Sequence, residues 1–423
     1  MENKPDLIIY NIGQLLTIRG ATQKPKTSWQ MDDLGIIEDG AVAIKDGQFF
    51  YVSASEEIMD LYAADTNKII NAYGKTAMPG FVDCHTHAVF GGNRAAEFVE
   101  RIQGATYHEI LKKGGGIVNT VNTTRKLSAE KLAALTKKRL DDMLLHGTTT
   151  VEIKSGYGLD LMNEIKILKT IRHLQKTHCL DIVPTFLGAH TIPVEYKHDP
   201  DAYVDLVCDM LPFAREYATF CDVFCDEGAF NAKQTEKIFL AAKNAGFQLK
   251  LHANEFKDVG GIPLAIQYDA VSVEHLDCIT SKEIHQLSGS KAVCVLLPGI
   301  PLFLMKNTYA PAKEMLENGL AIALATDFNP GTCPCLNMQI MITLASLKMS
   351  MTPPQAINAA TINAAHALSM AHRIGSIEAG KQADMIILDI DDYQQLSYYF
   401  GINHVQTVIK KGRIVVENKI LAT

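Results

Sequence analysis

The sequence predicts an α/β protein: a distorted (β/α)8 TIM-type barrel with a small composite β-sandwich built from both termini. Three observations predict it. Apolar, β-branched segments alternate with helical segments eight times, these segments end in polar residues, and both termini carry hairpin patterns. The composition is that of a globular protein, since 47% of the 423 residues are hydrophobic and 21% are charged. An open doubly wound sheet is the alternative, but no G-x-G-x-x-G follows the first strand segment.

Eight segments have the near-continuous hydrophobicity of strands that are buried on both faces of a parallel sheet. They are residues 80–87, 148–154, 181–190, 220–225, 247–255, 270–276, 291–298 and 321–331. Several of the helical stretches between them have clear boundaries. Stretch 128–147 begins with a Ser cap and ends at Gly, 231–246 begins with Asn and ends at Gly, and another begins at Thr352 before two prolines. We therefore expect one closed barrel.

The two ends of the chain predict a second, smaller β-structure. Residues 38–53 form two short strands around an Asp-Gly turn. Residues 383–391 and 405–417 repeat this pattern, with a Lys-Gly turn in the latter. Because an isolated hairpin is only marginally stable in water, we expect the N- and C-terminal strands to pack together. The predicted domains are a terminal sandwich, residues 1–78 and 374–423, and a barrel, residues 79–373.

Charge and hydrophobicity exclude several classes of function. The formal net charge of −7 gives no basic excess to follow a phosphate backbone, so we expect no nucleic acid as partner. No apolar run reaches the ~20 residues that cross a bilayer, so we expect no membrane partner either. The first residues lack the apolar core and cleavage site of a signal peptide. With scattered cysteines expected to be reduced thiols, these features predict a cytoplasmic protein.

The ends of the predicted strands carry a candidate metal site, where barrel enzymes place their chemistry. The first strand ends in His85 and His87, which point to the same side because they are two apart in an extended segment. The fifth strand adds His252 and the eighth adds Asp327. Three imidazoles and a carboxylate suit Zn²⁺ or Fe²⁺ better than Mg²⁺ or Ca²⁺. One such histidine alone is more often a hydrogen-bonded core residue, but several on one sheet edge favour a metal.

Several motifs resemble the amidohydrolase superfamily. They are FVDCHTH, HANE, EHL and ATDFNPG at the ends of strands one, five, six and eight, and GSIEAGKQADMIILD near the C-terminus. The resemblance implies a metal-dependent hydrolase on a distorted barrel with a composite sandwich. Many members carry a carboxylated lysine on strand four that bridges two metals, but here that strand ends in Cys225-Asp226-Glu227. Lys154 lies on strand two, where we expect a structural ion pair. The resemblance thus points to the mononuclear subset, which includes cytosine deaminases, with one divalent or ferric ion, zinc or iron, per chain.

A second group of motifs narrows the resemblance to the superfamily members that open an imidazolone ring in histidine degradation. These motifs are VFGGNRAAEF, GGGI, TTTVEIKSGYGL, TFLGAHTIPVEY, VLLPG and ATDFNPGTCP, and they extend in order over nearly the whole chain. The resemblance implies that the small-molecule substrate is 4-imidazolone-5-propanoate. Water would attack the ring carbonyl, the C–N bond would open, and N-formimidoyl-glutamate would leave. The habit of the family also suggests a homodimer.

The same resemblance assigns roles to individual residues. The implied metal ligands are His85, His87, His252 and Asp327. Asp327 would also accept the proton of the attacking water, and His275 would orient or polarise that water. Glu255 would hydrogen-bond the ring nitrogen of the substrate and carry the proton to the leaving nitrogen.

The implied substrate has a propionate tail, which needs a cation and hydrogen-bond donors. Arg94, after strand one, offers a bidentate fork for a carboxylate, and Tyr157 offers a phenol hydrogen. His190, at the end of strand three, is expected to hydrogen-bond the imidazolone oxygen or ring. The product end would be bound by Asn329, Gly331 and Thr332. Whether the GGGI loop, residues 114–117, touches the substrate through its backbone or acts as a flexible lid stays open.

Two other functions are compatible with these residues. A deaminase of a heterocyclic base such as cytosine or guanine would use the same metal ligands, but a neutral base would not need Arg94 and Tyr157. A non-catalytic scaffold is the second alternative. Such a protein would have lost metal ligands, whereas the candidate set is complete here.

Overall fold

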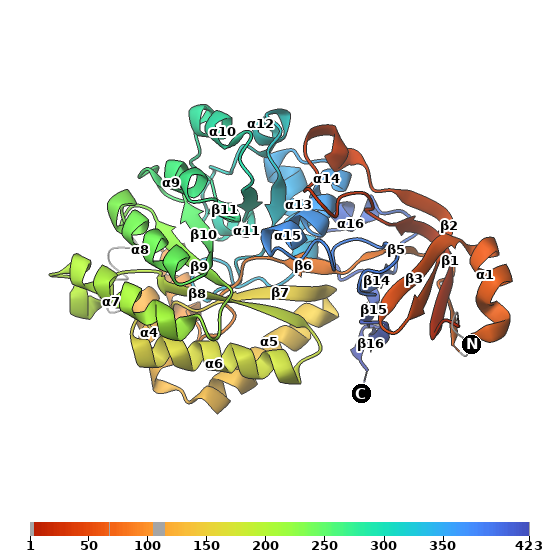
Figure 1. The fold of residues 1–423 in the computed structure, drawn as a ribbon, viewed down its shortest axis with the longest axis horizontal. Coiled ribbons are helices and arrows are strands. Elements are labelled where there is room, and N and C mark those ends of the chain that lie inside the picture. The colour runs from red at the N-terminus through yellow and green to blue at the C-terminus, as the bar shows by residue number, and fades with distance from the viewer. Residues whose placement is uncertain (1–3, 67, 105–114, 423) are drawn as a thin grey trace.

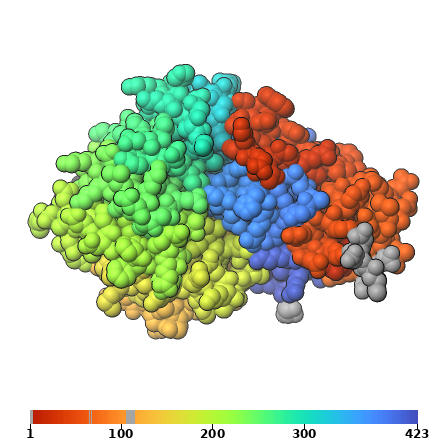
Figure 2. Space-filling view, in the orientation of Figure 1, coloured from red at the N-terminus to blue at the C-terminus, as the bar shows by residue number. Residues whose placement is uncertain are grey.

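Two β-sheets, with helices surrounding one of them, make up the protein (Figure 1). The computed structural model describes residues 4–66, 68–104 and 115–422. Within these ranges eight parallel strands form one sheet and nine strands form a second, mixed sheet. Figure 2 shows the N-terminal residues and the C-terminal third of the chain meeting on one face of the molecule. No helix in the described ranges is both long and apolar enough to pass through a membrane.

The strands of the parallel sheet lie side by side in the order in which they follow one another along the chain. They are β6 (Phe81–Asp83), β7 (Thr148–Lys154), β8 (Asp181–Ala189), β9 (Phe220–Cys225), β10 (Gln248–Ala253), β11 (Ser272–His275), β12 (Val293–Leu296) and β13 (Ile322–Leu324). Each strand pairs in parallel with the next. Each of the eight segments that we predicted to be strands contains one of them, so that prediction is confirmed.

The first and last strands of this sheet are joined just beyond their ends, where an isolated parallel bridge links them. The backbone N–H of Asp327 donates to the carbonyl oxygen of His85 at 3.0 Å. The carboxylate of Asp83 accepts hydrogen bonds from the backbone N–H of Thr326 at 3.0 Å and from its hydroxyl at 2.6 Å. The sheet therefore nearly closes into a barrel, and its seam runs through residues of the candidate metal site.

Helices cover the outside of the barrel (Figure 1). They are α5 (Ala129–Leu145), α6 (Leu161–Thr177), α7 (Pro200–Ala214), α8 (Ala232–Asn244), α9 (Gly261–Gln267), α10 (Ser281–Leu287), α11 (Gly299–Phe303), α12 (Ala312–Glu317), α13 (Met338–Met349), α14 (Pro353–Ala359) and α15 (Ile362–Ala367). The predicted helix starts are confirmed. Side chains of Ser128, Asn231 and Thr352 accept hydrogen bonds from backbone N–H groups in the first turns of α5, α8 and α14.

The mixed sheet combines strands from both ends of the chain, in the order β17-β16-β15-β14-β5-β1-β2-β3, with β4 beside β1. They are β1 (Leu7–Leu16), β2 (Ile36–Lys45), β3 (Gln48–Ala54), β4 (Ile69–Asn71), β5 (Thr76–Pro79), β14 (Met385–Leu388), β15 (Val405–Lys410), β16 (Arg413–Glu417) and β17 (Ile420–Leu421). N- and C-terminal strands meet where β5 and β14 pair antiparallel. The predicted joining of the two termini is confirmed, while the residue boundaries between the two domains stay a prediction.

Both predicted hairpin turns are present. Asp46 and Gly47 have φ angles of 50° and 76°, and Lys411 and Gly412 have φ angles of 50° and 73°. Two successive positive φ values let a two-residue turn follow the right-handed twist of its strands. A separate hydrophobic cluster holds this sheet together, and a larger one fills the barrel and the space under its helices.

Candidate metal centre and active site

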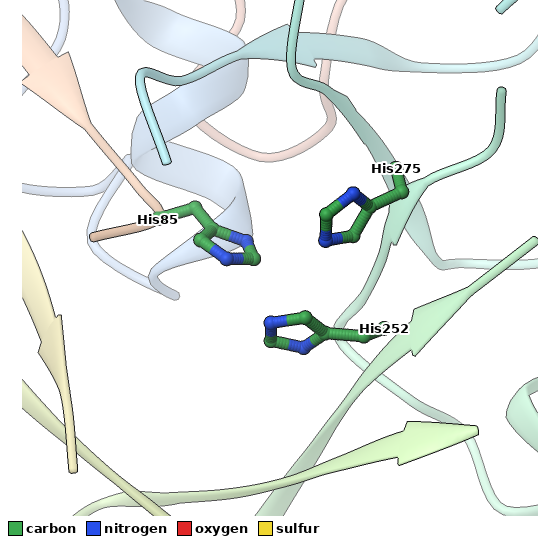
Figure 3. Close-up of side chains that lie close together, drawn as sticks. All are labelled: His85, His252 and His275. Atoms are coloured by element: carbon green, nitrogen blue, oxygen red, sulfur yellow. The ribbon is translucent and has the colours of Figure 1, made fainter. Parts of the chain in front are cut away.

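Five chemically active side chains converge at the C-terminal ends of the barrel strands. They are His85, His87, His252, His275 and Asp327, and each is between 0% and 3% exposed. The ligand atoms of His85, His252 and His275 lie within 4.8 Å of one another, and so do those of His85, His87 and Asp327. Figure 3 shows the imidazoles of His85, His252 and His275 pointing toward one another from different parts of the chain. The four predicted metal ligands are thus brought together, with His275 beside them.

In this cluster the candidate metal-ligand atoms lie close enough together to bind one ion. Asp327 Oδ1 lies 3.3 Å from Nε2 of His85 and 3.3 Å from Nε2 of His87, and these two nitrogens are 3.3 Å apart. The ring of His252 is centred 4.5 Å from that of His85. Nε2 of His252 is buried and has no hydrogen-bond partner among the described residues. Buried polar atoms are rarely left without a partner, so the donor set fits a metal ion bound by imidazole nitrogen and carboxylate oxygen.

Two buried carboxylates stand behind two of the imidazoles. Glu274 Oε2 lies 2.5 Å from Nδ1 of His85, and Asp222 Oδ2 lies 2.9 Å from Nδ1 of His252. A carboxylate that accepts the Nδ1–H leaves the lone pair of Nε2 free for a metal. Sequence reasoning assigned no role to Asp222 or Glu274. The available signal was a carboxylate inside a segment predicted to be a buried strand, Asp222 in β9 and Glu274 in β11, because a buried charge needs a buried partner.

The electrostatics of the centre favour a positive charge near His85. Burial lowers the pKa of this imidazole, but Glu274 and Asp327 outweigh that effect and raise the pKa to about 9. Burial lowers the pKa of His87 to about 4. Burial alone would raise the pKa of Asp327, but His85 and His87 hold that pKa well below its usual value. The carboxylate of Asp327 is therefore ionised at neutral pH, and a bound cation satisfies the charge that the site prefers.

Glu255 lies beside the centre, at a distance of 3.5 Å from its Oε2 to Nδ1 of His275. Burial, followed by the negative charge of Asp327, raises the pKa of Glu255 well above its usual value. The loop that carries Glu255 is held by Asp226, which directly follows β9. The Asp226 carboxylate accepts the backbone N–H groups of Glu255 at 2.7 Å and of Lys257 at 3.0 Å. Asp226 was missed as a positioning residue, although a carboxylate at a strand end was visible in the sequence.

The backbone at these strand ends is strained. Four residues other than glycine have φ angles in the left-handed region: Asn254 at 55°, His275 at 78°, Leu276 at 66° and Asp327 at 47°. Such conformations cost about 1–3 kcal/mol each and persist where the surrounding structure enforces them, commonly at functional sites. Two of these four residues, His275 and Asp327, belong to the cluster itself.

Arg94 and Gly331, both predicted to bind the substrate, lie in direct contact. Arg94 precedes α2 (Ala95–Ile102), and its Nε donates to Glu97 Oε2 at 2.7 Å. Glu97 Oε2 also accepts the backbone N–H of Gly116 at 3.0 Å, just before α4 (Ile117–Lys126). The loops after β6 and β13 therefore meet at the mouth of the barrel. Of the GGGI loop, Gly114 lies outside the described residues.

Tyr157 and His190 stand next to His87. The rings of His190 and His87 are stacked with centroids 4.9 Å apart, and the centroid of Tyr157 is 5.3 Å from that of His190. Burial raises the pKa of Tyr157, so its phenol keeps its proton. The loop of Tyr157 is held by Glu164 on α6, whose buried carboxylate accepts the backbone N–H groups of Gly156, Gly158 and Leu159. Glu164 was also missed, because nothing local to the SGYGL motif points to it.

Asn329 and Thr332 form a tight turn after Asp327. The Asn329 amide donates to the carbonyl oxygen of Asp327 and to Thr332 Oγ1, each at 2.8 Å. Its oxygen accepts the backbone N–H groups of Gly331 and Thr332, each at 2.8 Å. The side chain of Asn329 is thus fully engaged in shaping the turn, while the hydroxyl hydrogen of Thr332 remains available to a ligand.

Comparison with known proteins agrees with this fold and centre. A model of the amidohydrolase family matches residues 76–415. Imidazolonepropionase from Alkaliphilus oremlandii is 46% identical over 415 residues, which cover 97% of this chain and 98% of that protein. Imidazolonepropionase from Geobacillus kaustophilus is 45% identical over 417 residues, which cover 97% and 98%. The chain therefore belongs to the amidohydrolase family, in the branch that the imidazolonepropionases form.

Solved structures share the fold at much lower sequence identity. An adenosine deaminase from Xanthomonas campestris with bound zinc has a TM-score of 0.73 and 19% identity, and the match covers 99% of this chain and 95% of that one. Atrazine chlorohydrolase from Arthrobacter aurescens in complex with zinc has a TM-score of 0.70 and 15% identity, covering 98% and 96%. The predicted barrel architecture and superfamily are confirmed. Family membership and the imidazole–carboxylate centre together support a divalent metal ion.

Proposed function

We propose that the protein is a metal-dependent hydrolase that opens the ring of 4-imidazolone-5-propanoate at its amide C–N bond and releases N-formimidoyl-L-glutamate. The observation that carries this proposal is the 46% identity to an imidazolonepropionase over 97% of the chain. The buried cluster of histidines and Asp327 supports it, because hydrolysis of a ring amide needs an activated water. Deamination of a neutral heterocyclic base is less well supported, since the barrel mouth presents the guanidinium of Arg94.

The residues that would hold the metal are His85, His87, His252 and Asp327. When bound there, zinc or iron lowers the pKa of a water ligand toward ~7 and polarises the substrate carbonyl. His275 is close enough to be a further metal ligand. We assign it to orienting the water, because its Nδ1 lies 3.5 Å from Glu255, the proposed proton donor, whereas Nδ1 of His85 and of His252 lie closer, at 2.5 Å and 2.9 Å, to the carboxylates of Glu274 and Asp222.

Two carboxyl groups with opposite protonation states would move the proton. Asp327 is ionised at neutral pH, because its imidazole neighbours hold its pKa low, and so it takes the proton of the attacking water. Burial raises the pKa of Glu255, which favours its protonated form, and we assign it to hydrogen-bonding the ring nitrogen and giving its proton to the leaving nitrogen. Transfer of the water proton from Asp327 to Glu255 then restores both groups for the next turnover.

Residues at the mouth would bind the propionate and the ring. The guanidinium of Arg94 pairs with the propionate, and the phenol of Tyr157 adds a hydrogen bond. Nδ1 of His190 lies 3.0 Å from the carbonyl oxygen of Gly156, and burial lowers the pKa of this imidazole well below its usual value. The neutral ring donates through Nδ1 and accepts through Nε2. Two partners were expected for His190, the imidazolone oxygen and the imidazolone ring. The free Nε2 acceptor is suited to a ring N–H and not to the oxygen, which would need a donor.

The turn after Asp327 would bind the product end of the molecule. The hydroxyl of Thr332 can donate to a carboxylate or formimidoyl group. Asn329 would contribute by holding the turn, and Gly331 by leaving room for Arg94. The substrate contacts of these three residues stay proposals.

The test is to incubate zinc-loaded protein with imidazolonepropionate and, separately, with cytosine. We expect formimidoyl-glutamate from the first and no ammonia from the second. Protein stripped of metal with a chelator is the matched control and should leave imidazolonepropionate intact. Ammonia from cytosine without ring opening of imidazolonepropionate would replace this function with deamination.

A further inference from the structure

We propose that Lys154 is a positioning residue of the metal centre. Its ammonium holds the carboxylates of Asp222 and Glu274, which in turn fix His252 and His85 with their Nε2 atoms toward the metal. The inference rests on the metal ligands proposed above, and it gives Lys154 a role beyond that of a structural ion pair.

Lys154 lies behind two imidazoles at once. It is the last residue of β7, and its side chain is fully buried. Its Nζ is 2.7 Å from Asp222 Oδ2 and 2.9 Å from Glu274 Oε2. These are the same two oxygens that face the Nδ1 atoms of His252 and His85, at 2.9 Å and 2.5 Å. One ammonium thus connects both carboxylate–histidine pairs.

The ammonium of Lys154 is the positive charge beside a group of two carboxylates and one imidazole. The ligand atoms of Asp222, His252 and Glu274 lie within 4.8 Å of one another, a spacing that can hold an ion. Lys154 contacts two of the three. A buried carboxylate is stable in its charged form only when it is paired and hydrogen-bonded. Without the ammonium, Asp222 Oδ2 and Glu274 Oε2 would lose the group that holds both of them in place, and neither oxygen would be fixed opposite its Nδ1 atom.

Lys250, on the neighbouring strand β10, provides a matched control. It is equally buried, and its Nζ lies 2.7 Å from Glu152 Oε2 and 2.9 Å from Glu274 Oε1. Glu274 Oε1 accepts the hydroxyl of Ser272 and is not the oxygen that faces His85. Lys250 therefore supports the same network without contacting a carboxylate oxygen that faces a histidine, although its Nζ also donates to the carbonyl oxygen of Cys84 at 3.2 Å.

The experiment compares zinc affinity in Lys154→Met and Lys250→Met by competition with a chromogenic chelator. Loss of an outer-shell partner typically weakens metal binding by about 10- to 100-fold, and we expect a loss of this size for Lys154→Met. Lys250→Met should bind zinc as the unmodified protein does, even if both variants lose thermal stability. Unchanged affinity in Lys154→Met, or an equal loss in both variants, overturns the inference. If the unmodified protein binds no zinc, the proposed metal site itself fails.

Two further measurements keep the inference testable if Lys154→Met does not fold. The double variant Lys154→Met with Glu152→Gln restores the net charge of the network, and Glu152 faces neither imidazole; its zinc affinity should still fall. In the unmodified zinc-loaded protein, selective ¹⁵N labelling of histidine should show that His85 and His252 carry their protons on Nδ1. A proton on Nε2 of either residue, or full zinc affinity in the double variant, overturns the inference.

Discussion

The guanidinium of Arg94 lies against the Cα of Gly331, so close that a Cβ at position 331 would come within 2.0 Å of its Nη1 atom. The two residues come from opposite ends of the barrel sheet, in the loops after β6 and β13. Arg94 can therefore occupy this position at the mouth of the barrel only because residue 331 has no side chain. Through the proposed pairing of Arg94 with the propionate, this contact would make substrate affinity depend on a residue that has no side chain.

Replacing Gly331 with alanine should raise KM for imidazolonepropionate and change kcat less, because the new methyl group pushes the guanidinium from the propionate site. We expect about a 10-fold rise, a partial loss of one charge-assisted hydrogen-bonded pair. Steady-state kinetics with imidazolonepropionate measure both KM and kcat. The backbone φ of Gly331 is not in the left-handed region, so the variant should fold. A KM equal to that of the unmodified protein would show that Arg94 moves aside without cost.

Replacing Arg94 with glutamine removes the charge that would pair with the propionate. Hydrogen bonds to charged groups contribute about 1.5–3 kcal/mol, so KM should rise by about 10- to 100-fold. The double variant with Gly331→Ala provides the decisive comparison. If Gly331 acts through Arg94, the double variant should have the same KM as Arg94→Gln alone. Additive increases would mean that the two residues act separately, and an unchanged KM in Arg94→Gln would remove the anchor assignment.

Replacing Asp226 with asparagine should lower kcat and leave KM and zinc affinity nearly unchanged. The Asp226 carboxylate holds the backbone of the loop that carries Glu255, and it contacts none of the proposed metal ligands. A misplaced proton donor loses part of the ~10²- to 10⁴-fold that general acid–base catalysis contributes. Glu227→Gln is the control, because Glu227 and its partner Lys257 are 63% and 61% exposed and such pairs contribute little. Equal kcat in both variants would contradict this role.

The parts of the fold that the sequence predicts are those that depend on local patterns. Strands such as β12 and β13 are buried along their whole length, and their sequences, VCVL and IAL, are unbroken apolar runs. Helix α8 needs a cap at Asn231, and each hairpin needs a two-residue turn with positive φ. These requirements are met within a few residues of chain, which is why the strand segments and helix starts agree with the structure.

The family resemblance supplied loop residues such as Arg94, and reasoning from the residues alone predicted the metal ligands, because these side chains stand at strand ends. His85, His252 and Asp327 were visible for this reason. Supporting residues were not, because their partners are distant: Asp226 holds a loop 29 residues away in sequence. The contact between Arg94 and Gly331 likewise depends on closure of the barrel. No local pattern encodes such pairings, so the supporting contacts had to come from the structure.

Replacing Asp181 with asparagine should lower the melting temperature at neutral pH, and this difference should shrink in acid. Asp181, at the start of β8, lies 2.8 Å from Nζ of Lys410 and 2.7 Å from Nζ of Lys411, and so ties the barrel to the terminal sheet. Burial would raise the pKa of Asp181, but these cations hold it well below its usual value. A carboxyl whose pKa is lower in the folded protein contributes its full stabilisation above the unfolded pKa, ~3.9 for Asp, and loses it progressively as the pH falls from that value through the folded pKa.

Melting temperatures of the unmodified protein and of Asp181→Asn, measured from pH 7 to pH 3, check this expectation. At neutral pH the free energy of unfolding of Asp181→Asn should be lower by about 1.5–3 kcal/mol, as for hydrogen bonds to a charged group. The melting temperatures of the two proteins should approach each other below about pH 4. Asp205→Asn is the matched control, because Asp205 pairs with Lys237 at side-chain exposures of 61% and 51% and should contribute little at any pH. A difference between the unmodified protein and Asp181→Asn that persists unchanged at pH 3 would show that packing at Asp181, and not its charge, joins the two sheets.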